Sequence, residues 1–200
     1  MENYSAGAVS RPTLFKEAVT LSDLLLQGLE LKEIMRLAVD ENLLLYNAPD
    51  RRRQIASTVL KRLDALAPEA LGILDNGSLE GKKIVTMVSI LKTDRYFREF
   101  MMEVYLDKIH MGSFEISDAD FDIFNTYRKE QSEQVANWTP VTVKKLRQVY
   151  KKMLVDLGFA KGKGAVLQLT PPLLNSEIMD IVKNEELHIK KILEGGNLNA

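Results

Sequence analysis

The stretch from Trp138 to Pro172 constrains the fold most, because it specifies a helix, both ends of that helix and the turn that follows. Thr139 suits an N-cap, since its hydroxyl can accept a bond from a free backbone N–H, and Pro140 suits the first helical position. Gly158 can adopt the positive φ that commonly ends a helix. The sequence therefore predicts a helix from about residue 139 to residue 157.

Turned at about 100° per residue, this helix has an apolar side and a basic side. The apolar side carries Val143, Leu146, Val149, Tyr150, Met153, Leu154 and Leu157. The basic side carries Lys144, Lys145, Arg147, Gln148, Lys151 and Lys152. Two short strands follow, joined by a tip in which glycines separate Lys161 from Lys163. A basic helix before a basic hairpin is typical of winged-helix nucleic-acid readers. The alternative is a solvated helix face beside a tight turn.

Elsewhere the apolar spacing predicts an all-α, mainly helical protein. The expected helices cover residues 13–27, 31–41, 51–67, 68–76, 79–91, 95–109, 117–134 and 176–193. Asp50 is expected to cap the third, Asp94 to cap the sixth, and Ser117 with Asp120 to open the seventh with a capping box. Phe114–Ile116 alternates as a short strand does. Residues 195–200 are expected to fray.

This order predicts an N-terminal helical bundle over residues 1–92. Residues 93–200 then form a winged-helix-like half with a short β-hairpin and a final packing helix, because the strand, the helices and the hairpin follow one another as in winged-helix domains. A single compact unit that contains both halves is the alternative.

Charge and composition limit the possible functions. The 27 Lys and Arg residues nearly balance the 28 Asp and Glu residues, so nucleic-acid binding requires a local basic patch. The absence of cysteine and of any long apolar run favours a cytoplasmic protein. Arg51, Arg52 and Arg53 form a second basic group, poorly placed at a helix start that already carries partial positive charge. They predict a contact with phosphate or a partner, and substitution is expected to leave stability unchanged or raise it. The alternative is a solvated cluster with acidic neighbours.

No catalytic or metal-binding constellation is evident, and no cofactor is expected. His110 and His188 lie far apart in the sequence, without the spacing of metal ligands. The stretch around Gly77 and Lys82 is one residue short of a phosphate-binding loop and follows no strand. Asp118, Asp120 and Asp122 alternate on a helix start, where they diverge. Trp138 is expected to anchor helices, with base stacking as the alternative.

Several segments together resemble the BrxA family, the small accessory proteins of BREX bacteriophage-exclusion systems. They are Tyr4–Gly7, Ser10–Ala18, Leu91–Phe97, Phe100-Met101, Glu103–Tyr105 and the stretches from Glu130 through Trp138 to Tyr150-Lys-Lys. The resemblance spans nearly the whole chain. It implies a non-enzymatic, cytoplasmic, all-helical protein that binds double-stranded DNA and is similar to the antitermination protein NusB in part of its fold.

Three functions therefore remain in view. The first is a DNA-binding accessory of a phage-defence complex, which contacts phosphates through its Lys and Arg residues and reads bases only through Arg147, Gln148 or the hairpin. Four to six such contacts would give a salt slope of about −4 to −5. The second is an adaptor that docks other BREX subunits through the N-terminal bundle. The third is RNA binding by analogy with NusB.

Overall fold

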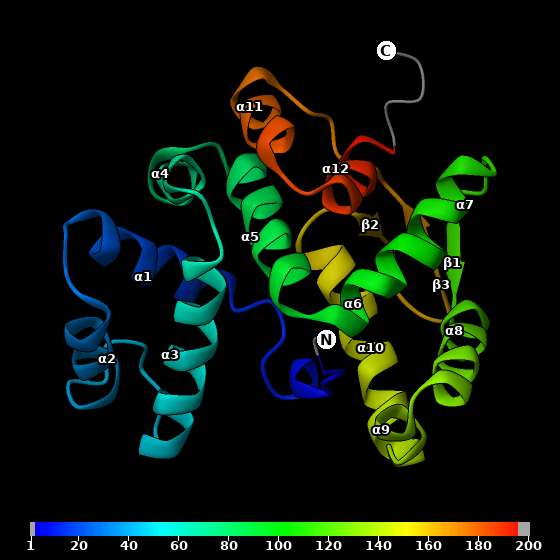
Figure 1. Cartoon of the computed structure of the whole chain (residues 1–200), viewed down its shortest axis with the longest axis horizontal. Helices are drawn as coiled ribbons and strands as arrows, with labels where there is room; N and C mark the ends of the chain where they lie inside the picture. The colour runs from blue at the N-terminus through cyan, green and yellow to red at the C-terminus, as the bar shows by residue number, and fades with distance from the viewer. Residues whose placement is uncertain (1–2, 196–200) are drawn as a thin grey trace. The chain divides into compact units, whose positions relative to one another are not determined.

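The computed structural model of the chain describes residues 3–195 and divides into two compact units (Figure 1). The N-terminal bundle is Leu14–Thr93, and the C-terminal unit joins Asp94–Ala200 to Met1–Thr13. The sequence-based division assigned the first residues to the bundle instead. The structure is mainly helical with one small sheet, as predicted. Of the stretch expected to fray, all but Gly195 lies outside the described residues.

The bundle consists of five consecutive helices. They are α1 (Phe15–Leu26), α2 (Leu31–Val39), α3 (Pro49–Asp64), α4 (Pro68–Asn76) and α5 (Leu79–Thr93). Every residue of α5 from Ile84 to Leu91 is buried, including two hydroxyl side chains. Thr86 donates to the Lys82 carbonyl at 2.8 Å, and Ser89 donates to the Thr86 carbonyl at 2.7 Å. Both hydroxyls are therefore satisfied within the helix, which makes their burial tolerable.

The predicted cap of the third helix was wrong. Asp50 lies inside α3, and Ala48 occupies the N-cap position without a side-chain bond. Pro49 takes the first helical position, where its fixed φ and missing N–H both suit the helix. The helix therefore begins at the proline, before the aspartate.

The C-terminal unit contains the remaining elements. They are the short 3-10 helix η1 (Gly7–Val9), α6 (Arg95–Phe100), the π-helical segment η2 (Met101–Tyr105), α7 (Leu106–His110), β1 (Glu115–Ser117), α8 (Asp118–Gln131), α9 (Glu133–Ala136), α10 (Pro140–Asp156), β2 (Ala160–Lys161), β3 (Val166–Leu169), α11 (Ser176–Asn184) and α12 (Leu187–Glu194). None of the helices within residues 3–195 is both long and apolar enough to cross a membrane.

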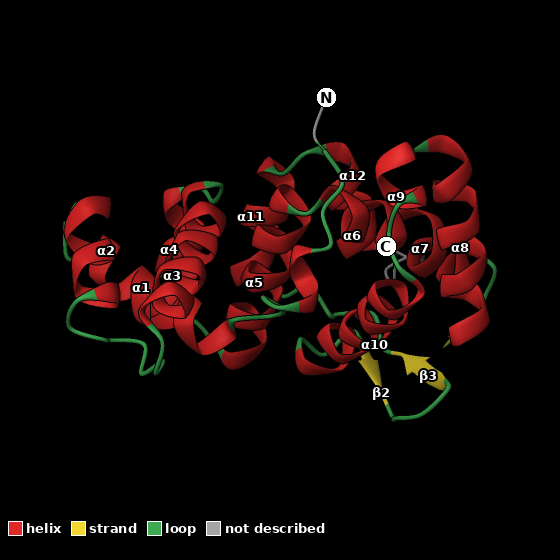
Figure 2. Ribbon diagram, turned by 90° about the horizontal axis from the view of Figure 1, so that it is seen from below, coloured by secondary structure: helices red, strands yellow, loops and turns green. Residues whose placement is uncertain are grey.

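The strand, the helices and the hairpin occur in the predicted order. The three strands form one antiparallel sheet in the order β1-β3-β2. Ile116 of β1 pairs with Leu167 of β3, and Lys161 of β2 pairs with Gln168 of β3. β3 is therefore the central strand, between β1 and β2. The loop that joins β2 to β3 projects beyond the strands, and α10 runs beside them (Figure 2).

Three predicted helices are interrupted in the structure. The expected helix over 95–109 contains the π-helical segment η2. The expected helix over 117–134 breaks at Ser132, whose hydroxyl caps the separate helix α9 by accepting from Val135 N–H. The last helix breaks at Glu185, which has extended backbone. In each case the apolar periodicity continues across the break, so spacing alone does not reveal it.

Aromatic side chains form the core of the C-terminal unit. Tyr96, Phe97, Phe100, Phe121 and Tyr150 are all nearly or fully buried and pack with ring centroids 4.7–6.5 Å apart. Edge-to-face and tilted arrangements predominate, as the ring quadrupole favours. These rings come from α6, α8 and α10, so they hold together the helices on which the basic residues stand.

Candidate nucleic-acid interface

Helix α10 has the ends and the orientation that the sequence predicts. The Thr139 hydroxyl accepts from Thr142 N–H at 3.1 Å, and Gly158 follows the helix with a φ of 83°. The helix buries Leu146, Tyr150, Met153 and Leu154. Burial also raises the pKa of the Tyr150 phenol well above its ordinary value. The basic side of α10 therefore faces away from the core on a well-anchored helix.

Lys151 connects α10 to the hairpin tip, which we define as residues 161–164. Its ammonium donates to the carbonyls of Gly164 and Ala165 at 2.5 and 2.7 Å, and it pairs with Asp118 at 2.5 Å. Only 12% of its side chain is exposed. Lys151 therefore fixes the tip against the helix and is not free to meet a phosphate.

Two other cations of the predicted set also have acidic partners. Arg147 pairs with Asp122 at 2.7 Å and lies 3.7 Å from Asp118, with 20% of its side chain exposed. Lys152 pairs with Asp156 at 2.8 Å but is 66% exposed. An exposed pair of this kind contributes at most about 1 kcal/mol, so Lys152 can leave its partner easily. Arg147 is held more firmly, because two carboxylates from α8 surround it.

The side chains of four exposed lysines of the predicted set make no hydrogen bond or ion pair with any described residue. They are Lys144, Lys145, Lys161 and Lys163, which we call the duplex lysines after the ligand that the sequence predicts for them. Gln148 is exposed and likewise has no side-chain partner in the described chain. These groups are the ones on this surface that can bind an anion without first losing a contact.

A groove brings part of this set together. It has a volume of about 490 Å³ and is lined from α10 by Gln148 and Lys152 and from the hairpin tip by Lys163. Gly162 and Gly164 have φ values of 100° and 94°, a region that favours glycine, and so they allow the tight tip. Lys144 and Arg147 line a different pocket, between α8 and α10. Lys145 and Lys161 lie outside both linings.

The arginine cluster, Arg51 to Arg53, belongs to the bundle and has local partners. Arg52 donates to the carbonyls of Tyr46 at 2.6 Å, Val39 at 3.1 Å and Asn47 at 3.3 Å. The Arg51 guanidinium lies 5.7 Å from the centre of the Tyr46 ring, a cation–π distance. Arg53 lies 4.0 Å from Asp50 and is 67% exposed. Arg52 thus satisfies carbonyls at the end of α2 and in the following loop.

Tyr46 adds a further hydrogen bond to this arrangement. Its hydroxyl donates to Glu17 at 2.6 Å. Burial and this bond to a carboxylate raise the pKa of Tyr46 to about 12. The phenol therefore stays neutral at physiological pH and keeps its proton for Glu17. The loop before α3 is held at both Tyr46 and Arg52.

The acidic partners of the basic residues on α10 were not predicted from the sequence. Asp118 and Asp122 lie on α8 and contact Arg147 across the unit. Asn125 was also missed, although it is buried on the same helix. A polar residue among Phe121, Phe124 and Arg128 at helical spacing indicates a buried polar group, and that signal was available.

The structure offers little for metal or phosphate-loop chemistry. No group of three or more His, Asp or Glu side chains within the described residues could hold a metal ion. His110 is exposed at the end of α7, and His188 lies 3.5 Å from Glu186. In the stretch after Gly77, Lys82 donates to the Asp75 carbonyl and so caps the preceding helix α4.

Two comparisons with known proteins identify the family, and a third shows the fold. The family model BrxA matches residues 2–186. A BREX protein BrxA from Bacillus cereus (strain H3081.97) is 37% identical over 180 residues, which are 90% of each chain. The crystal structure of an uncharacterized protein from Magnetospirillum magneticum superposes with a TM-score of 0.81 at 20% identity, over 97% of this chain and 100% of that one. This last likeness supports the fold alone.

Proposed function

Since the chain belongs to the BrxA family of BREX phage-defence proteins, we propose that it is a non-enzymatic accessory protein that binds double-stranded DNA in the cytoplasm. The observation that carries this proposal is the set of four unpaired duplex lysines on α10 and the hairpin tip. Binding would come mainly from phosphate contacts, because ammonium groups on flexible stems suit phosphates rather than base edges. The order of strand, helices and hairpin supports a winged-helix mode.

Lys151 supports the proposal by its position. It joins the hairpin tip to α10 through two backbone carbonyls, so the lysines of the tip and of the helix are held as one surface. A rigid surface loses less conformational entropy on binding than two independent segments would. Gln148, exposed between Lys144 and Lys151 on α10, is the best-placed residue to reach a base edge.

The test is a binding series with duplex DNA, single-stranded DNA and RNA at several salt concentrations. If the four duplex lysines each neutralise one phosphate, the log–log salt slope is about −3.6. This is shallower than the slope expected from sequence, since Arg147 and Lys151 already have partners. Preference for RNA over duplex DNA would favour the NusB-like alternative instead.

A matched pair of variants makes this test specific. Changing all four duplex lysines to Gln is expected to weaken duplex binding about a hundredfold or more at moderate salt and to flatten the slope. The control changes Lys16, Lys32, Lys61 and Lys191 to Gln, four exposed lysines with the same total charge. If the folded first variant binds as tightly as wild type, the proposed surface is wrong.

An adaptor function is the second candidate, and the observation that favours it lies in the C-terminal unit rather than in the N-terminal bundle, where the docking was expected from sequence. Met111, Ile123 and Tyr127 are 79%, 57% and 59% exposed and line one groove of about 400 Å³ in the C-terminal unit. Exposed apolar groups gathered in this way mark protein contacts. The partner would be another BREX subunit. Ile123→Glu with Tyr127→Glu should abolish its co-purification with the co-expressed subunits and leave duplex binding intact.

A further inference from the structure

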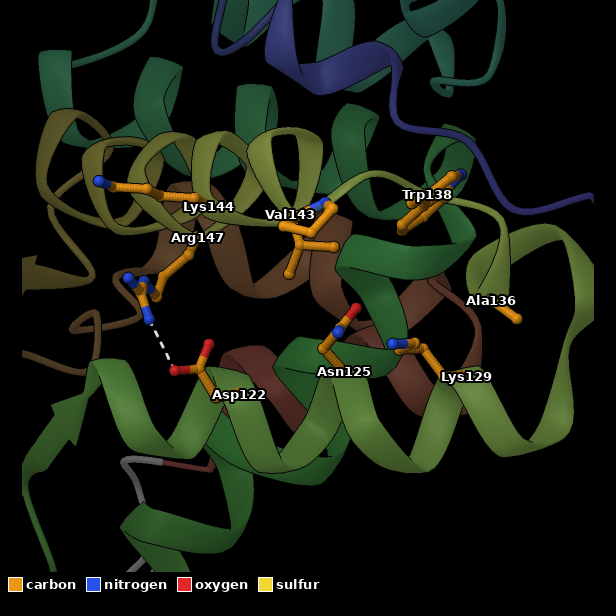
Figure 3. Close-up of a pocket in the computed structure, with 9 residues that line it drawn as sticks. Asp122, Asn125, Lys129, Ala136, Trp138, Val143, Lys144 and Arg147 are labelled. Atoms are coloured by element: carbon orange, nitrogen blue, oxygen red, sulfur yellow. Dashed lines mark hydrogen bonds and ion pairs between the residues drawn. The ribbon is translucent and has the colours of Figure 1, made fainter.

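The pocket between α8 and the start of α10 is a separate feature of the C-terminal unit (Figure 3). Its volume is about 530 Å³, within the range of small-molecule sites. Trp138, just before α10, and Val143, on α10, supply apolar surface, while Asn125 and Lys129 project from α8 (Figure 3). Pro140 also lines the pocket. The pocket thus combines a flat aromatic ring, an amide and cationic groups.

The buried Tyr96 holds two of these groups in place. Its ring packs edge-to-face with Trp138, with centroids 4.8 Å apart, and its hydroxyl donates to Asn125 Oδ1 at 2.8 Å. Asn125 is only 7% exposed, and the hydrogen bond from Tyr96 orients its amide. Its Nδ2 group makes no hydrogen bond within the described part of the chain. The pocket therefore contains a preorganised donor beside an aromatic wall.

The charged groups at the pocket divide into paired and unpaired ones. Arg147 is compensated by Asp122, with which it pairs at 2.7 Å (Figure 3). The side chain of Lys129 is exposed and has no hydrogen-bond or ion-pair partner among residues 3–195, whereas Lys144, also unpaired, points away from Asn125 and Trp138 (Figure 3). A free ammonium group favours an anion such as a phosphate monoester. The free charge beside the amide of Asn125 is therefore that of Lys129.

We propose that this pocket binds a single nucleotide. The base lies against Trp138 and Val143, an acceptor on its edge receives the Asn125 Nδ2 donor, and the phosphate lies at Lys129. Stacking on an aromatic side chain stabilises a bound base, and it needs an unpaired base. The ligand is therefore a free nucleotide or an unpaired nucleotide within a strand. The inference does not depend on duplex binding, in which bases stay paired.

The chain carries its own reporter, because Trp138 is its only tryptophan. The probes are the four deoxynucleoside 5′-monophosphates and the four corresponding nucleosides, titrated against Trp138 fluorescence. N-acetyltryptophanamide corrects for absorption by the bases. We expect saturable quenching by at least one monophosphate and weaker binding of its nucleoside.

Variants at the rim test the phosphate position. Lys129→Gln should raise the dissociation constant of the monophosphate about two- to fivefold, the size of an exposed ion pair, and leave that of the nucleoside unchanged. Lys191→Gln on α12, also exposed and outside the pocket, is the matched control and should change neither. Asn125→Asp keeps the acceptor for Tyr96 and removes the donor, so it should alter the base preference.

A second arm separates the two sources of the nucleotide. A duplex with one unpaired, bulged nucleotide should quench Trp138 more than the fully paired duplex if the site accepts a nucleotide within a strand. Quenching by monophosphates alone assigns the site to free nucleotides. Absence of quenching by monophosphates and by the bulged duplex overturns the proposal, as does equal binding of an acidic peptide. Lys129 lies outside the duplex lysines, so this failure is distinct from failure of duplex binding.

Discussion

The arginine cluster of the bundle and the duplex lysines of the C-terminal unit have similar sequence signatures and different surroundings. Each is a dense group of cations on a helix or next to one. The guanidinium of Arg52 donates to three backbone carbonyls, whereas the side chains of Lys144 and Lys163 make no hydrogen bond or ion pair with any residue from 3 to 195. The charge available to a ligand is the charge that remains after local acceptors have been satisfied.

The chemistry of the two side chains explains the difference. A guanidinium presents several donors in a rigid fork, so it suits the cluster of carbonyls at the end of α2 and in the next loop. The lysines of the hairpin tip alternate with Gly162 and Gly164, which offer no side-chain acceptor. Lysine heads on exposed stems remain hydrated and mobile. The tip is therefore suited to phosphate contact, and the cluster to holding a loop.

The largest expected effect comes from disrupting the packing of α10, the helix that carries Lys144 and Lys145, against the core. Leu146 is fully buried on α10, so Leu146→Asp places an unpaired carboxylate in the aromatic core. We expect a loss of several kcal/mol, about 3–5, in the free energy of unfolding. Urea unfolding measures it. Gln148→Asp, on the exposed side of the same helix, should change stability by less than about 0.5 kcal/mol. An unchanged midpoint for Leu146→Asp would mean that α10 faces the other way.

The next effect distinguishes neighbours within the arginine cluster. Arg52→Gln leaves up to three carbonyls without their donor and should lower the free energy of unfolding by about 1–3 kcal/mol. Arg53→Gln should change it little, since Arg53 is exposed and 4.0 Å from Asp50. The helix dipole alone predicts the opposite, namely that removing a cation from the start of α3 leaves the free energy of unfolding unchanged or raises it. If Arg52→Gln weakened duplex binding and left stability unchanged, the arginine cluster would be part of the DNA-binding surface.

The sequence was sufficient to predict several helix ends, which depend on residues that are close together in the chain. Thr139 and Pro140 specify the start of α10, Asp94 caps α6 through Phe97 N–H at 3.0 Å, and Ser117 with Asp120 forms the predicted capping box. Each depends on bonds within four residues. The mainly helical fold follows from the same local signals and the apolar spacing between them.

Sequence was insufficient where partners come from distant parts of the chain. Lys151 meets the carbonyls of the hairpin tip, and Arg147 meets Asp122 across 25 residues of chain. Helical spacing shows which way these cations point but not which acceptors lie there. The π-helical segment η2 was missed for a related reason, since its extra residue per turn leaves the apolar pattern nearly unchanged.

Loosening the hairpin tip should give an intermediate effect. Lys151→Gln removes a nearly buried ammonium and its bonds to Gly164 and Ala165, and leaves Asp118 with less compensation. We expect a loss of about 1–2 kcal/mol and faster hydrogen exchange at the tip amides. Duplex affinity should fall even though all four duplex lysines remain. Unchanged exchange at the tip would show that Lys151 does not hold it.

The smallest effect gives the sharpest form of the comparison, because it uses two exposed lysines of one helix. Lys145 has no partner in the described chain, whereas Lys152 pairs with Asp156 at 2.8 Å. Lys145→Gln should make the salt slope less negative by about 0.9 and weaken duplex binding equally on unrelated sequences. Lys152→Gln should change the slope by less than half as much, since contact with a phosphate requires Lys152 to leave its carboxylate.

Neither change should alter the free energy of unfolding by more than about 0.5 kcal/mol. Equal slopes for the two variants would show that pairing with an exposed carboxylate does not withhold a lysine from DNA, and Lys152 would then join the duplex lysines.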